Sequence, residues 1–79
     1  MPTIVSANGF DIRILTNDHR PAHVHCFKAG KTAKIEIAGL PAVTSTTMTY
    51  RDTNKALQLV TAHRALLRRQ WKKYHGSLR

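Results

Sequence analysis

Acidic residues are scarce in this sequence, and cysteine and long apolar runs are scarcer still. Four acidic residues stand against 13 lysines and arginines, which gives a formal net charge of +9 with neutral histidines. The single cysteine, Cys26, excludes an intrachain disulfide framework and a four-cysteine zinc site, and it fits a reducing compartment. No apolar run reaches the length of about 18 residues that a membrane-spanning helix needs, and the first residues lack the pattern of a secretory signal. We therefore expect a cytoplasmic protein that is neither secreted nor inserted in a membrane.

The chain is short, with 79 residues, so it has room for one hydrophobic core and not for two. We expect residues 1–79 to form a single domain. Apolar residues make up 42% of the sequence, which is close to the usage of globular proteins and far from that of disordered chains. A core of this size gives a net stability of only about 5 kcal/mol, so a bound ion, a partner or a second copy in a homodimer can add appreciably to it.

A first β-hairpin is predicted at the N-terminal end. Asn8-Gly9, a pair that readily takes the positive φ of a tight turn, lies between the β-branched runs Thr3–Val5 and Phe10–Thr16. Apolar and polar residues alternate in the second run, which is typical of a half-buried strand. Its apolar positions are Phe10, Ile12 and Ile14.

A second hairpin is predicted between Ala22–Lys28 and Thr32–Ala38. Gly30-Lys31 separates the two runs, and glycine at the first central position suits a two-residue type II′ turn. This register gives one apolar side, with Cys26 as a core residue, and one polar side, with His25 directly opposite Glu36. The apolar side consists of Val24, Cys26, Ala33, Ile35 and Ile37. The polar side consists of His23, His25, Phe27, Lys34 and Glu36.

The C-terminal third predicts one long amphipathic helix. Ala42–Tyr50 is rich in threonine and serine and indicates a loop or a short irregular strand. Asp52 or Thr53 can cap a helix that runs to about Tyr74 and stops at Gly76. The expected buried stripe is Ala56, Val60, His63, Leu67, Trp71 and Tyr74. The predicted fold is therefore α+β, with a small antiparallel sheet of two β-hairpins packed against one long C-terminal helix.

The predicted helix carries positive charge without any acidic residue between its cations. From Thr53 to Arg79 there is no Asp or Glu, so no salt bridges along the helix can neutralise these side chains. Such a one-signed surface favours an anionic partner, with nucleic acid the commonest and RNA preferred, although an acidic protein or a merely solvated face also fits. The candidate nucleic-acid-binding residues are Lys55, Arg64, Arg68, Arg69, Lys72 and Lys73.

A group of three histidines is the second candidate site. His19, His23 and His25 lie within seven residues, and the last two project from one side of a strand. Three interpretations remain open. The histidines are acid and base catalysts acting on RNA, or they bind a divalent transition metal such as Zn²⁺, Ni²⁺ or Fe²⁺, or they are structural residues without chemistry. The metal set would be His23, His25, Asp18 and Glu36.

The run from Asn17 to His25, followed by Lys34-Ile35-Glu36-Ile37 and a helix with Trp71 and Tyr74-His75-Gly76, resembles the small bacterial proteins grouped as domain of unknown function 4160. The motif of that family is similar to Asp-His-x-Pro-Pro-His-x-His, with Ala22 here in place of the second proline. The resemblance covers nearly the whole chain. It implies a compact prokaryotic α+β protein, often encoded beside another small gene as in toxin and antitoxin pairs.

Three functions follow as hypotheses. The first is a small basic protein of toxin-antitoxin type that binds nucleic acid, preferably RNA, through the cationic helix. The second is a histidine-dependent or metal-dependent ribonuclease or hydrolase that uses His19, His23 and His25. The third is an interaction module or inhibitor that binds an acidic protein. The sequence leaves open whether the protein is an enzyme.

Overall fold

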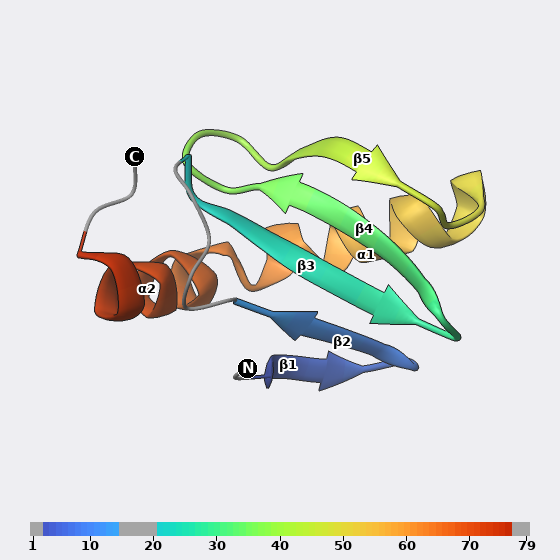
Figure 1. Cartoon of the computed structure of the whole chain (residues 1–79), viewed down its shortest axis with the longest axis horizontal. Coiled ribbons are helices and arrows are strands. Elements are labelled where there is room, and N and C mark those ends of the chain that lie inside the picture. Colours follow the sequence, from blue (N-terminus) through green and yellow to red (C-terminus); the bar gives the residue numbers. More distant parts are fainter. Residues whose placement is uncertain (1–2, 15–20, 77–79) are drawn as a thin grey trace.

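The protein consists of a five-stranded antiparallel sheet followed by two helices (Figure 1). The structure is a computed structural model and describes residues 3–14 and 21–76. The strands are β1 (Thr3–Ala7), β2 (Phe10–Arg13), β3 (His23–Lys28), β4 (Lys31–Glu36) and β5 (Ala42–Thr46), and the helices are α1 (Tyr50–Ala62) and α2 (Arg64–His75). The strand order in the sheet is β1-β2-β3-β4-β5, so each strand pairs with its neighbours in sequence. The α+β class is therefore confirmed.

The predicted hairpin at Asn8-Gly9 is confirmed. Asn8 has a φ of 54° and Gly9 a φ of 82°, as a type I′ turn requires at both central residues. Phe10 and Ile12 of β2 are buried, while Asp11 and Arg13, which alternate with them, are partly exposed. The alternation of apolar and polar residues therefore identified the buried side of β2.

The register predicted for the second hairpin is wrong by two residues. The turn residues are Ala29 and Gly30, with φ values of 49° and 78°, so the turn is type I′ and not type II′. His25 consequently pairs with Lys34, and Glu36 pairs with His23. Because side chains alternate with a period of two, a shift of two residues keeps every side chain on its predicted side of the sheet.

A fifth strand occupies the segment that indicated a loop or a short irregular strand. β5 pairs with β4 antiparallel, so the sheet is larger than two hairpins. Within this strand Ser45 pairs with Lys34 and Val43 with Ile35, so Thr44 stands between them without a partner in the register. The Oγ1 of Thr44 donates to the carbonyl oxygen of Lys34 at 3.2 Å. Such a bulge is a common way to protect an exposed edge strand from pairing with other chains.

The single long helix of the prediction is two helices. α1 begins after Thr49, whose hydroxyl accepts a hydrogen bond from the backbone N–H of Asp52, so neither Asp52 nor Thr53 is the cap. The helical conformation is interrupted at His63, with φ −109° and ψ 18°. One straight helix from Tyr50 to His75 would be about 39 Å long at 1.5 Å per residue, whereas the longest extent of the chain is 32 Å. The interruption keeps the second half of the helical segment against the sheet.

The core lies between one side of the sheet and the two helices. In Figure 1, α1 passes behind β3 and β4, and α2 lies near the end of the sheet at which β3 begins. Val24, Cys26, Ile35, Leu67 and Trp71 are all buried, as their spacing predicts. The predicted stripe is wrong at its last position, because Tyr74, which was expected in the core, is 38% exposed. The helices of the described part of the chain are too short or too polar to span a membrane.

Candidate functional site

His23 and His25 lie together on the side of β3 that faces away from Val24 and Cys26. Their ring centroids are 5.1 Å apart in an edge-to-face arrangement. His23 is 4% exposed, and its Nδ1 lies 2.8 Å from the carbonyl oxygen of Pro21. Because a carbonyl oxygen only accepts, Nδ1 of His23 is the donor in this hydrogen bond.

Trp71 connects this histidine pair to the end of α2. Its ring centroid lies 5.3 Å from that of His23 and 3.9 Å from that of His75, with which it stacks. The result is a continuous series of rings, His25–His23–Trp71–His75, which we call the histidine cluster. It joins the start of β3 to the last turn of α2, two segments far apart in the sequence.

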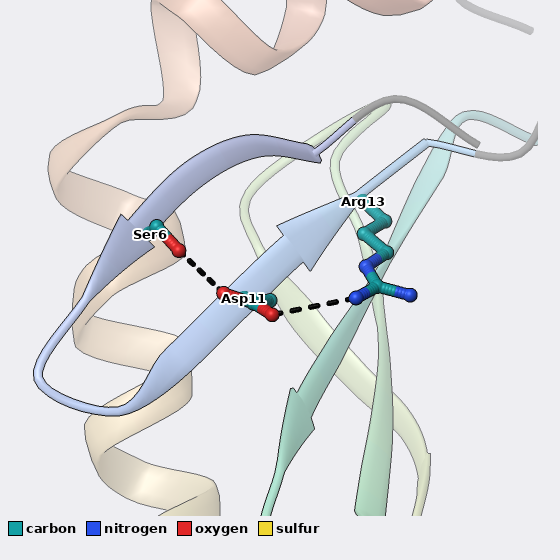
Figure 2. Close-up of polar contacts among 3 residues, drawn as sticks. All are labelled: Ser6, Asp11 and Arg13. Atoms are coloured by element: carbon teal, nitrogen blue, oxygen red, sulfur yellow. Dashed lines mark hydrogen bonds and ion pairs between the residues drawn. The ribbon is translucent and has the colours of Figure 1, made fainter.

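A polar network continues from the histidine cluster across β2 and β1 (Figure 2). Arg13 pairs with His25 in the sheet register, and its Nη2 lies 3.4 Å from a carboxylate oxygen of Asp11. Ser6 donates a hydrogen bond to the other oxygen of Asp11. The guanidinium carbon of Arg13 also lies 4.9 Å from the centre of the Phe27 ring, close enough for a cation–π contact. Arg13 is thereby held beside the histidine cluster by both charge and stacking.

Two buried donors, one in the histidine cluster and one beside it, lack a hydrogen-bond partner within the described residues. They are Nε of Arg13 and the indole Nε1 of Trp71. Buried donors are rarely left unpaired, because the cost of removing them from water is about 1–3 kcal/mol each. Among the described residues, both of these unpartnered atoms are donors, which would suit an anionic or oxygen-rich group.

The residues proposed to bind metal are only partly brought together. Glu36 faces His23 across the β3–β4 pair and not His25 as predicted. Across residues 3–14 and 21–76, no group of three or more His, Cys, Asp or Glu side chains is placed to hold a metal ion. Asp18 and His19, which the sequence assigned to the metal and catalytic sets, lie outside the described residues. The metal interpretation therefore stays a prediction.

The cations of the helical segment divide into an anchoring residue and a solvent-facing group. Arg64 donates from Nε and Nη2 to the carbonyl oxygen of Gly39, at 3.1 and 2.9 Å, so it holds the start of α2 against the loop before β5. Lys55 is exposed on α1. The remaining cations of α2 are at least partly exposed and are Arg68, Arg69, Lys72 and Lys73. In the described part of the chain, the ion pairs join Arg13 to Asp11 and Lys28 to Asp52, so none neutralises a cation of α2.

Sequence reasoning found His23 and His25 and missed the other members of their surroundings. His75 lies four residues after Trp71, so its stacking on the indole could have been predicted from helical spacing. The contact of Arg13 with Phe27 depends on the pairing of β2 with β3, and the sequence between these two strands does not indicate their register. His63, expected to be semi-buried, is half-buried, and its Nδ1 lies 2.9 Å from the carbonyl oxygen of Leu59.

Comparisons with known proteins give one positive result. The sequence model of the family described as "Domain of unknown function (DUF4160)" matches residues 9–72. The match includes β2 to β5, all of α1 and most of α2, and thus nearly all the residues of the candidate sites. No curated protein and no solved structure matches the chain.

Proposed function

The chain belongs to the DUF4160 family, and we propose that it binds nucleic acid, with a preference for RNA, through the cationic surface of α2. The observation that carries this proposal is the absence of any carboxylate partner, within the described residues, for the cations of α2. The proposal includes a role of toxin-antitoxin type, in which this surface contacts the nucleic-acid target.

The arrangement of the α2 cations supports a phosphate backbone as the partner. Among the solvent-facing cations, Arg68 and Lys72 are four residues apart, and Arg69 and Lys73 form a second such pair. Neighbouring like charges at this spacing destabilise a helix by a few tenths of a kcal/mol per pair. A polyanion that lies along the helix removes this repulsion and gains the free energy of counterion release. These pairs therefore cost stability in the free protein and gain affinity in the complex.

The proposal is tested by measuring binding to RNA, single-stranded DNA and duplex DNA as a function of salt. We expect gel shifts at about 50 mM salt and a steep loss of affinity as salt rises. Replacing two exposed cations, Arg69→Gln with Lys73→Gln, should weaken binding on the order of tenfold and lower the salt slope by about 1.4. The matched control is Lys31→Gln with Arg51→Gln, which removes one exposed lysine and one exposed arginine elsewhere. Absence of any shift at low salt, or equal losses in both variants, would exclude α2 as the interface.

A second function is favoured by the histidine cluster. We propose, as the alternative, that His23 and His25 cleave the bound RNA by acid–base catalysis. Two imidazoles with ring centroids 5.1 Å apart can serve as base and acid on the attacking 2′-hydroxyl and the leaving oxygen. The unpartnered donors of Arg13 and Trp71 support the presence of an oxygen-rich group nearby.

This alternative is tested by following the length of labelled RNA over time. The double variant His23→Ala, His25→Ala should lose at least 100-fold in cleavage rate, since positioned acid–base groups contribute about 10²–10⁴-fold. His63→Gln is the control, because its Nδ1 lies 2.9 Å from the carbonyl oxygen of Leu59 within the helical segment and its ring is not part of the histidine cluster. Retained affinity together with unchanged cleavage in the double variant would remove these residues from any mechanism.

A further inference from the structure

A groove of about 470 Å³ lies between the turn of the first hairpin, the end of β3 and one row of residues on α1. Its size falls within the range of about 300–1,000 Å³ that is usual for small-ligand sites. The lining residues are Asn8, Phe10, Lys28, Lys55, Gln58, Leu59 and Ala62. This groove contains none of the residues of the histidine cluster. Of the candidate nucleic-acid-binding residues, only Lys55 is in its lining.

The apolar residues of the lining are Phe10, Leu59 and Ala62, and contacts of Lys28 hold the wall beside Phe10. Phe10 is 2% exposed, and Leu59 is half-buried against the core. The ammonium group of Lys28 lies 4.8 Å from the centre of the Phe10 ring and 3.2 Å from a carboxylate oxygen of Asp52. These contacts fix the wall around the ring, so a flat apolar group entering the groove meets a surface that is already formed.

The rim of the groove has a different chemistry. Asn8 and Gln58 are exposed and carry amides, each of which both donates and accepts hydrogen bonds. Lys55 is exposed and forms no ion pair among the described residues, so its charge is available to an anion. Amide side chains are well suited to the edges of nucleobases, and lysine is a common partner of phosphate.

From this combination we propose that the groove binds one unpaired nucleotide of a single-stranded RNA. The base enters the apolar part beside Phe10 and Leu59, the amides of Asn8 and Gln58 contact its edge, and Lys55 contacts the phosphate. Unpaired bases that are splayed out and inserted between side chains are the usual basis of single-strand recognition. The proposal rests on the nucleic-acid function above and adds to it that single strands are preferred over duplexes.

Two alanines provide a matched pair of variants for the test. Ala62 lines the groove, Ala65 lies three residues further along on α2, and both are exposed. Ala62→Trp fills the groove, whereas Ala65→Trp adds the same side chain outside it. Each variant is titrated with a single-stranded RNA, with a duplex RNA of the same length, and with each of the four nucleoside monophosphates, using chemical shifts in NMR spectra as the readout.

We expect Ala62→Trp to weaken single-strand binding about tenfold or more, since one inserted base contributes about 1–3 kcal/mol, and to leave duplex binding unchanged. Ala65→Trp should alter neither. In the wild-type protein, monophosphates should shift the signals of Gln58 and Leu59, while inorganic phosphate at equal concentration should not. If single strands and duplexes bind equally and Ala62→Trp changes neither, the groove proposal is wrong while the α2 proposal survives. If no RNA of either form binds, the α2 proposal fails, and monophosphate shifts at Gln58 would then identify a site for free nucleotides.

Discussion

The two sides of β3 differ as much as two separate surfaces would. Val24 and Cys26 face the helices and are fully buried, whereas His25 and Phe27, their neighbours in the chain, are partly exposed on the other side. On the helix side, the residues of β3 contribute apolar volume to the core. On the other side each residue has a directed contact with a ring or a charge, such as the edge-to-face contact of His25 with His23.

This difference shows where stability and chemistry are located in the molecule. The helix side of the sheet provides most of the buried apolar area, and with it the driving force for folding. The other side provides groups that titrate or carry charge. Trp71 is the residue that belongs to both, since it is buried in the core and its ring lies 5.3 Å from that of His23.

The largest effect should come from removing the residue that joins the two sides. Trp71→Ala is expected to lower the free energy of unfolding by about 3–5 kcal/mol, because a fully buried aromatic side chain leaves a cavity that the core cannot fill. Tyr50→Ala is the control, because this tyrosine is 85% exposed, and its effect should stay within about 0.5 kcal/mol. Urea denaturation followed by circular dichroism measures both. Similar losses for the two variants would contradict the position of Trp71 in the core.

A smaller effect is expected from the contact of Arg13 with Phe27, which lies wholly on the side away from the helices. A double-mutant cycle of Arg13→Met and Phe27→Leu should give a coupling free energy of about 0.5–1 kcal/mol. Lys73 and Tyr74 offer a comparison, because their cation–π separation is 6.0 Å, at the limit of the interaction. The cycle of Lys73→Met and Tyr74→Leu should give a coupling close to zero. A larger coupling in the second cycle would mean that the sheet surface does not hold Arg13 in place.

The smallest effect concerns Cys26 on the helix side. Burial raises the pKa of its thiol from the ordinary value of 9.0 to about 12. Well below pH 9 the proton is bound in both the folded and the unfolded chain. As the pH rises, the unfolded chain releases the proton first, and the stability contributed by the neutral thiol is lost. Between pH 8 and 9 this thiol should lower the free energy of unfolding by about 0.4 kcal/mol.

The measurement for Cys26 compares the wild-type protein with Cys26→Ala at both pH values, because the remaining titrating groups are the same in each. The alkylation rate of the thiol provides a second readout. It should be slow in the folded protein at pH 8 and rise sharply in urea, since the thiolate is the reactive form. Rapid alkylation of the folded protein would show that the helix side of β3 is open to solvent.

The sequence predicted the faces of the strands better than it predicted their partners. Alternation of apolar and polar residues placed Cys26, Ile35 and His25 on their correct sides, because the period of a strand is a local property. The pairing of His25 with Glu36 was wrong because the turn geometry depends on which residues accept a positive φ. Ala29 has a φ of 49°. Alanine rarely takes a positive φ, so the sequence does not indicate that this residue lies in the turn.

In the helical segment, too, the local pattern was predicted better than the tertiary arrangement. Spacing predicted the buried positions Ala56, Val60, Leu67 and Trp71 and the end at Gly76, whose φ is 77°. It did not predict the interruption at His63, because nothing local requires one. With the interruption, the longest extent of the chain is 32 Å, whereas one straight helix over the same residues would be about 39 Å long.

The sequence by itself determined the α+β class, the side of the sheet on which the residues of β2, β3 and β4 lie, the buried positions Ala56, Val60, Leu67 and Trp71 of the helices, and the excess of positive charge. Each of these depends on residue type and on spacing over a few positions. Only the tertiary structure decided that His75 and Trp71 join His23 and His25, that Arg64 is anchored to Gly39, and that a groove forms beside Phe10. Those contacts connect segments distant in the chain, so they depend on strand register and helix direction, which are set when the whole core is packed.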